Sequence, residues 1–170
     1  MSKLELASVS NTPPETLTLL AGDEDLSVRW RVANNPNTTP EILTILARDK
    51  DASVRCRVAE NPKTPPETLT ILAQDEDWSV RWNVAHNSNT PPEILTILAR
   101  DKCSPVRHGV AGNTNTPPET LSLLARDMDE DVRWYVERNS NATREVIQTV
   151  RAYEFYAQFL NCPPNTHKEN

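Results

Sequence analysis

The sequence predicts an all-α protein, built as an α-solenoid of stacked helix pairs. The first observation is that the 170-residue chain returns to the same pattern every 26 residues, in five copies without gaps from residue 11 to residue 140. The second is that nine of the 14 prolines stand at one place in this pattern, where they can start a helix. The third is the helical spacing of apolar residues inside each copy. A helix pair of this length cannot bury its own apolar stripe, whereas stacked copies can.

Alignment of the copies shows which positions are constant. They read NTPPETLTLLAGDEDLSVRWRVANNP, NTTPEILTILARDKDASVRCRVAENP, KTPPETLTILAQDEDWSVRWNVAHNS, NTPPEILTILARDKCSPVRHGVAGNT and NTPPETLSLLARDMDEDVRWYVERNS. Copies two and four share PEILTILARDK, whereas copies one and three share PPETLT, DED and SVRW. This alternation indicates a duplicated unit of two repeats.

The first helix of each repeat is predicted to begin at its Thr-Pro-Pro-Glu segment. In the first copy we expect Thr12 to cap the helix, with proline where a missing N–H matters least and Glu15 three residues after the cap. The stripe expected to be buried consists of Leu17, Leu20 and Ala21, widened by Leu19.

The second helix of each repeat is predicted to follow an acidic turn. Asp25 or Ser27 can cap it in the first copy, and Val28 and Val32 then lie on one face. The asparagine that ends this helix suits a left-handed C-cap. It recurs in all copies, as Asn35, Asn61, Asn87, Asn113 and Asn139.

The segments PPExLxxLAxD and DxxVRxxVAxNP resemble the leucine-rich repeat variant family, with a wider similarity to HEAT and armadillo-type helical repeats. The resemblance covers the five full copies. It implies a right-handed superhelix of paired helices, in which one helix of each repeat can be a 3₁₀-helix. The founding type of the family also carries an iron–sulfur cluster on an N-terminal cysteine-rich segment. This chain begins MSKLELASVS, without cysteine, so no cluster or other cofactor is expected.

An aspartate before the second helix and an arginine within it occur in every copy. The aspartates are Asp23, Asp49, Asp75, Asp101 and Asp127, and the arginines are Arg29, Arg55, Arg81, Arg107 and Arg133. A residue needed once for chemistry has no reason to recur in each repeat. We therefore interpret the two columns as a ladder of bidentate ion pairs between neighbouring repeats, not as catalytic pairs.

Function is predicted at the second-helix positions that vary between copies and point away from the valines. The expected partner-binding residues are Trp30, Trp78, Trp82, His108 and Trp134, edged by Arg31, Arg57 and Tyr135. Second helices usually line the concave surface of such a solenoid, so we predict an aromatic groove that binds a protein or peptide segment without catalysing a reaction. The alternative, that the tryptophans pack between repeats, stays open.

Two other functions are less favoured. The variable positions carry three positive and three negative side chains, and the formal net charge is -6, so the basic stripe of a nucleic-acid-binding repeat protein is missing. A HEAT-like enzyme or chaperone that binds a small ligand or chromophore is the second alternative. Because the sequence shows no phosphate loop and no nucleophile with a positioned histidine, no catalytic residue is predicted.

The fourth repeat departs from the others in its second helix, CSPVRHGVAGN. Cys103 replaces the capping aspartate, so we expect Ser104 to cap a helix one residue shorter. Gly109 and Gly112 leave three alternatives: a weak helix, a notch beside His108 that receives a partner's side chain, or drift of a redundant repeat. Cys103 and His108 alone are too few for a metal site, and no metal is predicted.

The ends of the chain are expected to close the array. Residues 1–10 read as the remnant of a preceding second helix, residues 141–161 as a degenerate sixth repeat with a capping helix, and residues 162–170 as a disordered tail. The thin N-terminal cover suggests a monomer, a weak homodimer through this end, or a piece of a longer array. No apolar run resembles a signal peptide or membrane span, so the expectation is a cytoplasmic protein with reduced thiols and no membrane partner.

Overall fold

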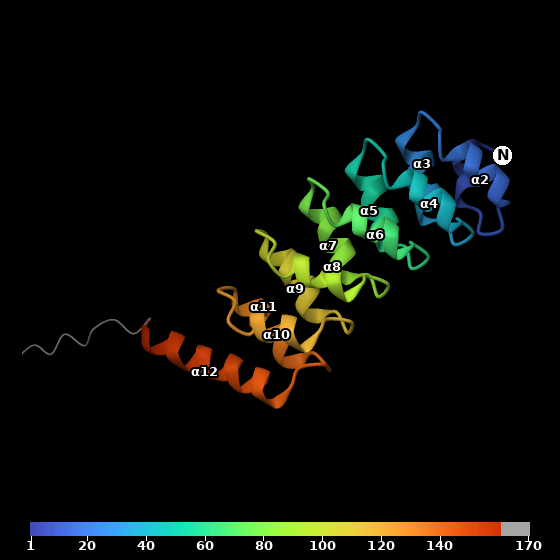
Figure 1. Ribbon diagram of the computed structural model, residues 1–170. Helices are drawn as coiled ribbons and strands as arrows, with labels where there is room; N and C mark the ends of the chain where they lie inside the picture. The colour runs from blue at the N-terminus through green and yellow to red at the C-terminus, as the bar shows by residue number, and fades with distance from the viewer. Residues whose placement is uncertain (161–170) are drawn as a thin grey trace, which may run out of the picture.

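The computed structural model describes residues 1–160, which contain twelve α-helices and no strand (Figure 1). The helix pairs stack in sequence order along an elongated solenoid, with one pair for each 26-residue copy (Figure 1). The predicted all-α array of helix pairs is therefore confirmed. The tail predicted at residues 162–170 lies outside the described residues.

Each repeat contributes a first helix of seven residues and a second helix of nine. The first helices are α2 (Pro14–Leu20), α4 (Pro40–Leu46), α6 (Pro66–Leu72), α8 (Pro92–Leu98) and α10 (Pro118–Leu124). The second helices are α3 (Leu26–Asn34), α5 (Ala52–Glu60), α7 (Trp78–His86), α9 (Ser104–Gly112) and α11 (Glu130–Arg138). Helix α1 (Lys3–Ser8) precedes these pairs and α12 (Arg144–Leu160) follows them. The described residues include no 3₁₀-helix, which the family resemblance had allowed.

The core is a continuous strip of aliphatic side chains shared between repeats. In the first copy the buried members are Leu17, Leu20, Ala21, Val28 and Val32, as predicted. Leu19, however, is 80% exposed. It follows Leu17 by two residues, about 200° around the helix, and therefore points to solvent. The prediction that Leu19 widens the buried stripe is wrong.

Neighbouring repeats contact each other mainly through their second helices. Helix α3 packs against α5, α5 against α7, α7 against α9 and α9 against α11, and α1 packs against α3 in the same way. The first helices contact chiefly the second helices that precede and follow them in the chain. The solenoid thus has a layer of closely packed second helices and a separate layer of first helices.

The threonine before each first helix joins two helices and does not cap one. The buried Thr38 hydroxyl donates to the backbone carbonyl of Val32, in the last turn of α3. The same bond forms one, two and three repeats later, at Thr64, Thr90 and Thr116. Pro13 occupies the N-cap position of α2, without a side-chain cap bond. The predicted threonine cap is therefore wrong, because the hydroxyl donates to a carbonyl in the last turn of the preceding helix.

The asparagine after each second helix forms a ladder through the molecule. Asn87 has φ -71° and ψ 127°, an extended conformation, so the predicted left-handed C-cap is wrong. Its buried side-chain amide donates to the carbonyls of Ala59 and Asn61 in the preceding repeat and accepts from the backbone N–H of Asn89. The same three bonds recur one and two repeats later, at Asn113 and Asn139.

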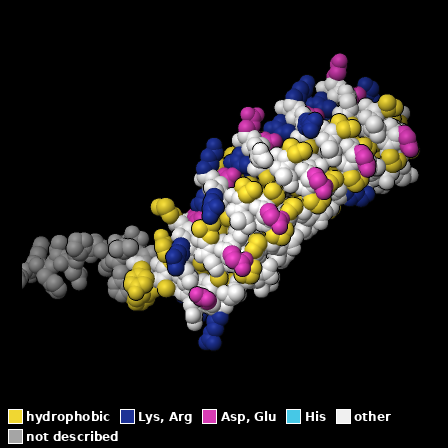
Figure 2. All heavy atoms as spheres, in the orientation of Figure 1, with side chains coloured by type: hydrophobic (Ala, Val, Ile, Leu, Met, Phe, Trp, Pro, Cys, Tyr) yellow, Lys and Arg dark blue, Asp and Glu magenta, His cyan; other side chains and the backbone are white. Residues whose placement is uncertain are grey.

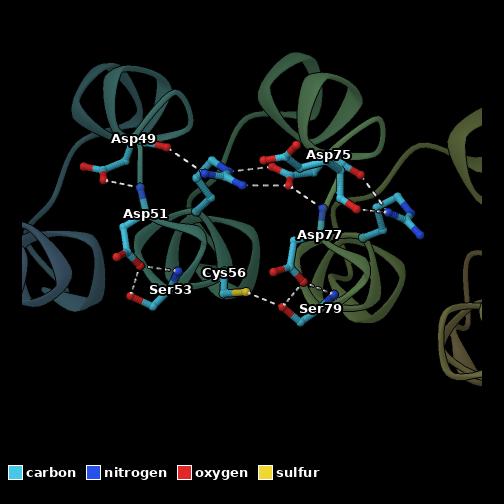
Figure 3. Close-up of polar contacts among 10 residues, drawn as sticks. Asp49, Asp51, Ser53, Cys56, Asp75, Asp77 and Ser79 are labelled. Atoms are coloured by element: carbon cyan, nitrogen blue, oxygen red, sulfur yellow. Dashed lines mark hydrogen bonds and ion pairs between the residues drawn. The ribbon is translucent and has the colours of Figure 1, made fainter.

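The predicted ladder of arginine and aspartate is confirmed. Arg81 Nε lies 2.6 Å from Asp101 Oδ2 and Nη2 lies 3.1 Å from Oδ1, a bidentate pair between two repeats. Its third nitrogen, Nη1, donates to the carbonyl of Asp75 at 2.7 Å. Equivalent pairs join Arg29 to Asp49, Arg55 to Asp75 and Arg107 to Asp127. Figure 3 shows the bridge that reaches Asp75.

Different side chains take over at the two ends of this ladder. Lys3 stands one repeat before Arg29 and pairs with Asp23 at 2.7 Å. At the other end the Arg133 guanidinium lies 5.0 Å from the ring centroid of Tyr153, a cation–π contact that replaces the missing aspartate. Helices α1 and α12 therefore continue the register of the repeats at each end.

The fourth repeat keeps its second helix at full length. Helix α9 begins at Ser104 with Cys103 at the N-cap, so the prediction of a Ser104 cap and a shorter helix is wrong. The backbone N–H of Cys103 donates to the Asp101 carboxylate, which holds the turn. A Cβ on buried Gly109 would lie 2.6 Å from His86 Nδ1 and 2.9 Å from the Ala85 Cβ. This glycine thus permits close packing of α9 on α7 and leaves no notch.

The ladder predicts a specific pH dependence of stability. Burial raises the pKa of Asp101, but hydrogen bonds from Arg81 and the Cys103 N–H outweigh it and hold that pKa below its ordinary value. Charged Asp101 therefore stabilises the fold above the ordinary aspartate pKa of about 4, and this contribution disappears as the pH falls through the lower, folded-state pKa. We expect Asp101→Asn to lose roughly 3 kcal/mol of unfolding free energy at neutral pH, because Arg81 loses its anion.

Urea denaturation followed by circular dichroism at neutral and acidic pH measures this loss. The deficit of Asp101→Asn against wild type should shrink in acid. Glu76→Gln, an exposed acid in the equivalent turn one repeat earlier, is the control and should match wild type at neutral pH. A deficit for Asp101→Asn that is equally large at both pH values would contradict the assignment.

Candidate functional site

All eight side chains predicted to bind a partner lie on the layer of second helices. Trp30 and Arg31 belong to α3, Arg57 to α5, Trp78 and Trp82 to α7, His108 to α9, and Trp134 and Tyr135 to α11. Because each second helix packs against the next, these side chains follow one layer of the solenoid. We call this layer's solvent-facing side the aromatic face.

The four tryptophans of the aromatic face fall into two classes. Trp78 is 48% exposed and Trp134 is 47% exposed. Trp30 and Trp82 are half-buried and pack against the hydrophobic core. Both alternatives from the sequence therefore hold, each for two of the rings: one pair is displayed and the other pair also supports the packing between repeats.

Cationic and aromatic neighbours cover several of these rings. The guanidinium carbon of Arg57 lies 4.7 Å from the Trp30 ring centroid, and that of Arg138 lies 3.8 Å from the Trp134 centroid. The His86 ring lies 4.2 Å from that of Trp82. Arg57, expected at the edge of a groove, is thus already engaged by an indole of the same face.

A hollow of about 470 Å³ lies on the aromatic face, lined by Trp30 and Trp82. Cys56, which also lines it, occupies the position that Trp30 and Trp82 hold in the adjacent repeats, so one indole is missing from the row. The Cys56 thiol lies 3.2 Å from the Ser79 hydroxyl (Figure 3). The remaining lining residues are Ala52, Ser53, Arg57, Glu60, Asp77, Ser79 and Asn83.

The polar lining of the hollow carries both signs of charge. Asp77 caps α7 and accepts hydrogen bonds from the hydroxyl and the backbone N–H of Ser79 (Figure 3). These bonds hold the pKa of Asp77 below its usual range, so its carboxylate is charged at neutral pH. Glu60 pairs with Arg57 at 2.5 Å on the same lining. The hollow therefore has two indole walls and an otherwise largely polar lining with carboxylates and one engaged guanidinium.

Three aromatic side chains gather at the C-terminal end of the aromatic face. The Tyr135 ring contacts Trp134 at a centroid distance of 4.9 Å and His108 at 5.0 Å, both edge to face. Gly112 lies beside this cluster, since a Cβ there would be 3.3 Å from the Tyr135 ring. Tyr135 is 40% exposed and can contact a partner together with Trp134.

One group of side chains has the composition of a cation site. Potential ligand atoms of His108, Asp129 and Asp131 lie within 4.8 Å of one another, and His108 Nε2 is buried without a hydrogen-bond partner. The pair considered from the sequence was His108 with Cys103, which is not a member of this group. Asp129 caps α11 by accepting from the Asp131 N–H, so only part of its carboxylate is available. Three groups are also one short of a closed tetrahedral zinc site.

A feature of the first-helix layer was missed in the sequence. Each first helix exposes one leucine or isoleucine at the same position: Leu19 (80%), Ile45 (59%), Ile71 (46%), Ile97 (63%) and Leu123 (45%). The signal was present, because this column is apolar in all five copies and yet lies out of phase with the buried stripe.

Comparison with known proteins gives one family model and a solved structure that are similar to this chain. A family model described as leucine rich repeat variant matches residues 52–77. A solved structure, described as a leucine-rich repeat variant with a novel repetitive protein structural motif, is 29% identical with a TM-score of 0.65 and matches 89% of this chain. The family model thus matches a segment of one repeat length, and the fold of the chain is similar to that of the solved leucine-rich repeat variant.

The relation to that structure has a limited extent. The match covers 64% of the solved chain, so this chain spans less than two thirds of the length of that structure. A search of curated proteins gave no match. Within residues 1–160, no helix is both long enough and apolar enough to cross a membrane.

The two classes of tryptophan predict different access to solvent. We expect Trp78→Phe/Trp134→Phe to show weaker acrylamide quenching of the remaining fluorescence than wild type, because the two half-exposed indoles are removed. Trp30→Phe/Trp82→Phe should show stronger quenching, because only the exposed pair remains. Stern–Volmer constants measure this difference. Equal constants for the two double variants would contradict the placement of the rings.

Proposed function

We propose that this protein is a non-enzymatic binding module that holds a segment of a partner protein along the aromatic face. The observation that carries the proposal is the hollow at Cys56, where an indole is missing between Trp30 and Trp82. Half-exposed Trp78 and Trp134 lie on the same helix layer. Tryptophan, tyrosine and arginine are the residues that most often carry the binding energy of protein interfaces.

The size and lining of the hollow fit a side chain of a protein segment. Its volume of about 470 Å³ lies within the range of roughly 300–1,000 Å³ found for ligand pockets. A large apolar side chain of the partner can fill the place of the missing indole. Asn83, Glu60 and Arg57 then offer donors and acceptors to the backbone beside it, in the usual arrangement of an apolar centre with a polar rim.

The charges of the hollow favour a protein over a nucleic acid. Binding of a phosphate backbone needs a basic stripe, with free lysines or arginines. Here Arg57 is paired with Glu60 and lies over Trp30, and Arg138 lies over Trp134. The carboxylates of Glu60 and Asp77 on the lining would repel phosphates. These contacts support the interaction-module proposal.

A reducing compartment is part of the same proposal. The described cysteines, Cys56 and Cys103, are both free thiols. Such thiols are typical of the cytoplasm, where disulfides are rare. We therefore propose that the module acts there.

The substitution Cys56→Trp tests the function by filling the hollow with the missing indole. Peptides selected from a displayed random library against the wild-type protein serve as probes, and fluorescence polarisation measures their affinity. We expect Cys56→Trp to bind them at least tenfold more weakly, a loss of about 1.4 kcal/mol or more.

Met128→Trp is the matched control, because it adds an indole in a turn where the native side chain is 91% exposed. It should leave peptide affinity unchanged. Circular dichroism melts establish that both variants remain folded. Peptides that bind Cys56→Trp as tightly as wild type would overturn the assignment of the hollow as the binding site.

A further inference from the structure

The first-helix layer carries three parallel rows of exposed side chains. Glu15, Leu19 and Gly22 are spaced i, i+4 and i+7, so they lie on one side of α2 and of the turn after it. The acidic row is Glu15, Glu41, Glu67, Glu93 and Glu119, and the apolar row is Leu19, Ile45, Ile71, Ile97 and Leu123. The third row contains Arg48, Arg100 and Arg126, with Gly22 and Gln74 in the alternate repeats. Figure 2 shows acidic side chains in a regular row beside hydrophobic ones along the molecule.

The apolar row has no role in holding the described residues together. Its members are 45% to 80% exposed, whereas the recurring valines are buried and the recurring arginines and asparagines make bonds between repeats. A continuous row of exposed leucine and isoleucine is uncommon on monomeric proteins and marks an interaction surface. The row recurs in all five copies, so a partner that contacts it must also extend along the solenoid.

We propose that a second copy of this chain docks on the first-helix layer and forms a symmetric dimer. The twofold axis runs along the length of the solenoid, between the two apolar rows. Rotation about this axis exchanges the two edges of the layer. The acidic row of one copy then faces the basic row of the other, and the apolar rows meet in the middle. The surface is self-complementary, as an isologous interface requires.

Charge distinguishes a second copy from other occupants of this surface. An anionic membrane or a nucleic acid would meet five glutamates and be repelled. The second copy brings an arginine opposite a glutamate on both edges of the layer in the second, fourth and fifth repeats, because the two rows lie on opposite sides of the apolar row. A hollow of about 420 Å³ between α8 and α10, lined in part by Glu93, Arg100 and Leu123, has room for an apolar side chain of the other copy.

The surface available to this dimer is small. A seven-residue helix is about 10 Å long, and five repeats about 10 Å apart give roughly 500 Å² for each copy. The total of roughly 1,000 Å² is at the low end for specific interfaces. Interfaces of this size are typical of transient association, so we expect the dimer to be reversible.

Sedimentation velocity of the full chain, over a concentration series from micromolar to millimolar, tests the dimer. Wild type should shift from monomer to dimer as the concentration rises. Ile71→Asp/Ile97→Asp should weaken association at least tenfold, about 1.4 kcal/mol. Its melting temperature at low concentration should stay near that of wild type, because the two side chains are 46% and 63% exposed.

Charge reversal tests the axis itself. In the proposed dimer Glu93 of one copy faces the partner's Arg100. Within one chain the two positions are seven residues, or about 10 Å, apart. Glu93→Arg and Arg100→Glu each bring like charges together and should weaken the dimer. The double variant Glu93→Arg/Arg100→Glu restores opposite charges and should recover wild-type association.

Two outcomes would overturn the proposal: a monomeric wild type at every concentration, or a double variant that associates no better than the single ones. Neither would affect the proposed peptide-binding function, since that function uses the other helix layer. Loss of peptide binding in Cys56→Trp likewise leaves the dimer unaffected.

Discussion

The structure depends on satisfying the backbone polar groups at the ends of very short helices. Four N–H groups and four carbonyls at the ends of any α-helix lack intrahelical partners, and helices of seven and nine residues contain few others. Side chains from the constant columns supply these partners. Thr90 donates to the Val84 carbonyl and Asn87 to the Ala59 carbonyl, each in the last turn of a second helix. Arg81 donates to the Asp75 carbonyl in the turn before α7 while pairing with Asp101. Since Asn87 and Arg81 both reach into an adjacent repeat, each repeat is completed by its neighbours.

This constraint separates the positions that hold the solenoid from those that can bind. The columns of threonine, asparagine, aspartate and arginine cannot change without leaving buried groups unpaired. The outward positions of the second helices keep no constant residue type, and one column there reads Trp30, Cys56, Trp82, His108 and Trp134. A column whose side chain differs from repeat to repeat suits recognition of one particular partner segment. The first-helix layer instead repeats the same glutamate and leucine or isoleucine, which suits association with an equally periodic surface, that of a second copy.

The period, the buried stripe and the ion-pair ladder were predictable because the same residue types recur at the same positions when the five copies are aligned. The roles of Thr38 and Asn87 were not. Capping rules consider neighbours within a few residues, whereas Asn87 bonds to Ala59, 28 residues earlier, and that contact exists only after stacking. Leu19 was misplaced because a seven-residue helix between two neighbours buries only a narrow stripe. The hollow at Cys56 could not be seen in sequence, since it depends on how indoles from two other helices lie around it.

The most direct test of the central constraint compares two asparagines two residues apart in urea denaturation. Asn87→Ala leaves the carbonyls of Ala59 and Asn61 and the N–H of Asn89 without that partner. It should lower the free energy of unfolding by about 3 kcal/mol, because each unpaired buried group costs about 1–3 kcal/mol. Asn89→Ala removes one side-chain bond, at an exposed site, to the Pro62 carbonyl and should cost less than about 1 kcal/mol. Equal, small losses for both variants would contradict the account.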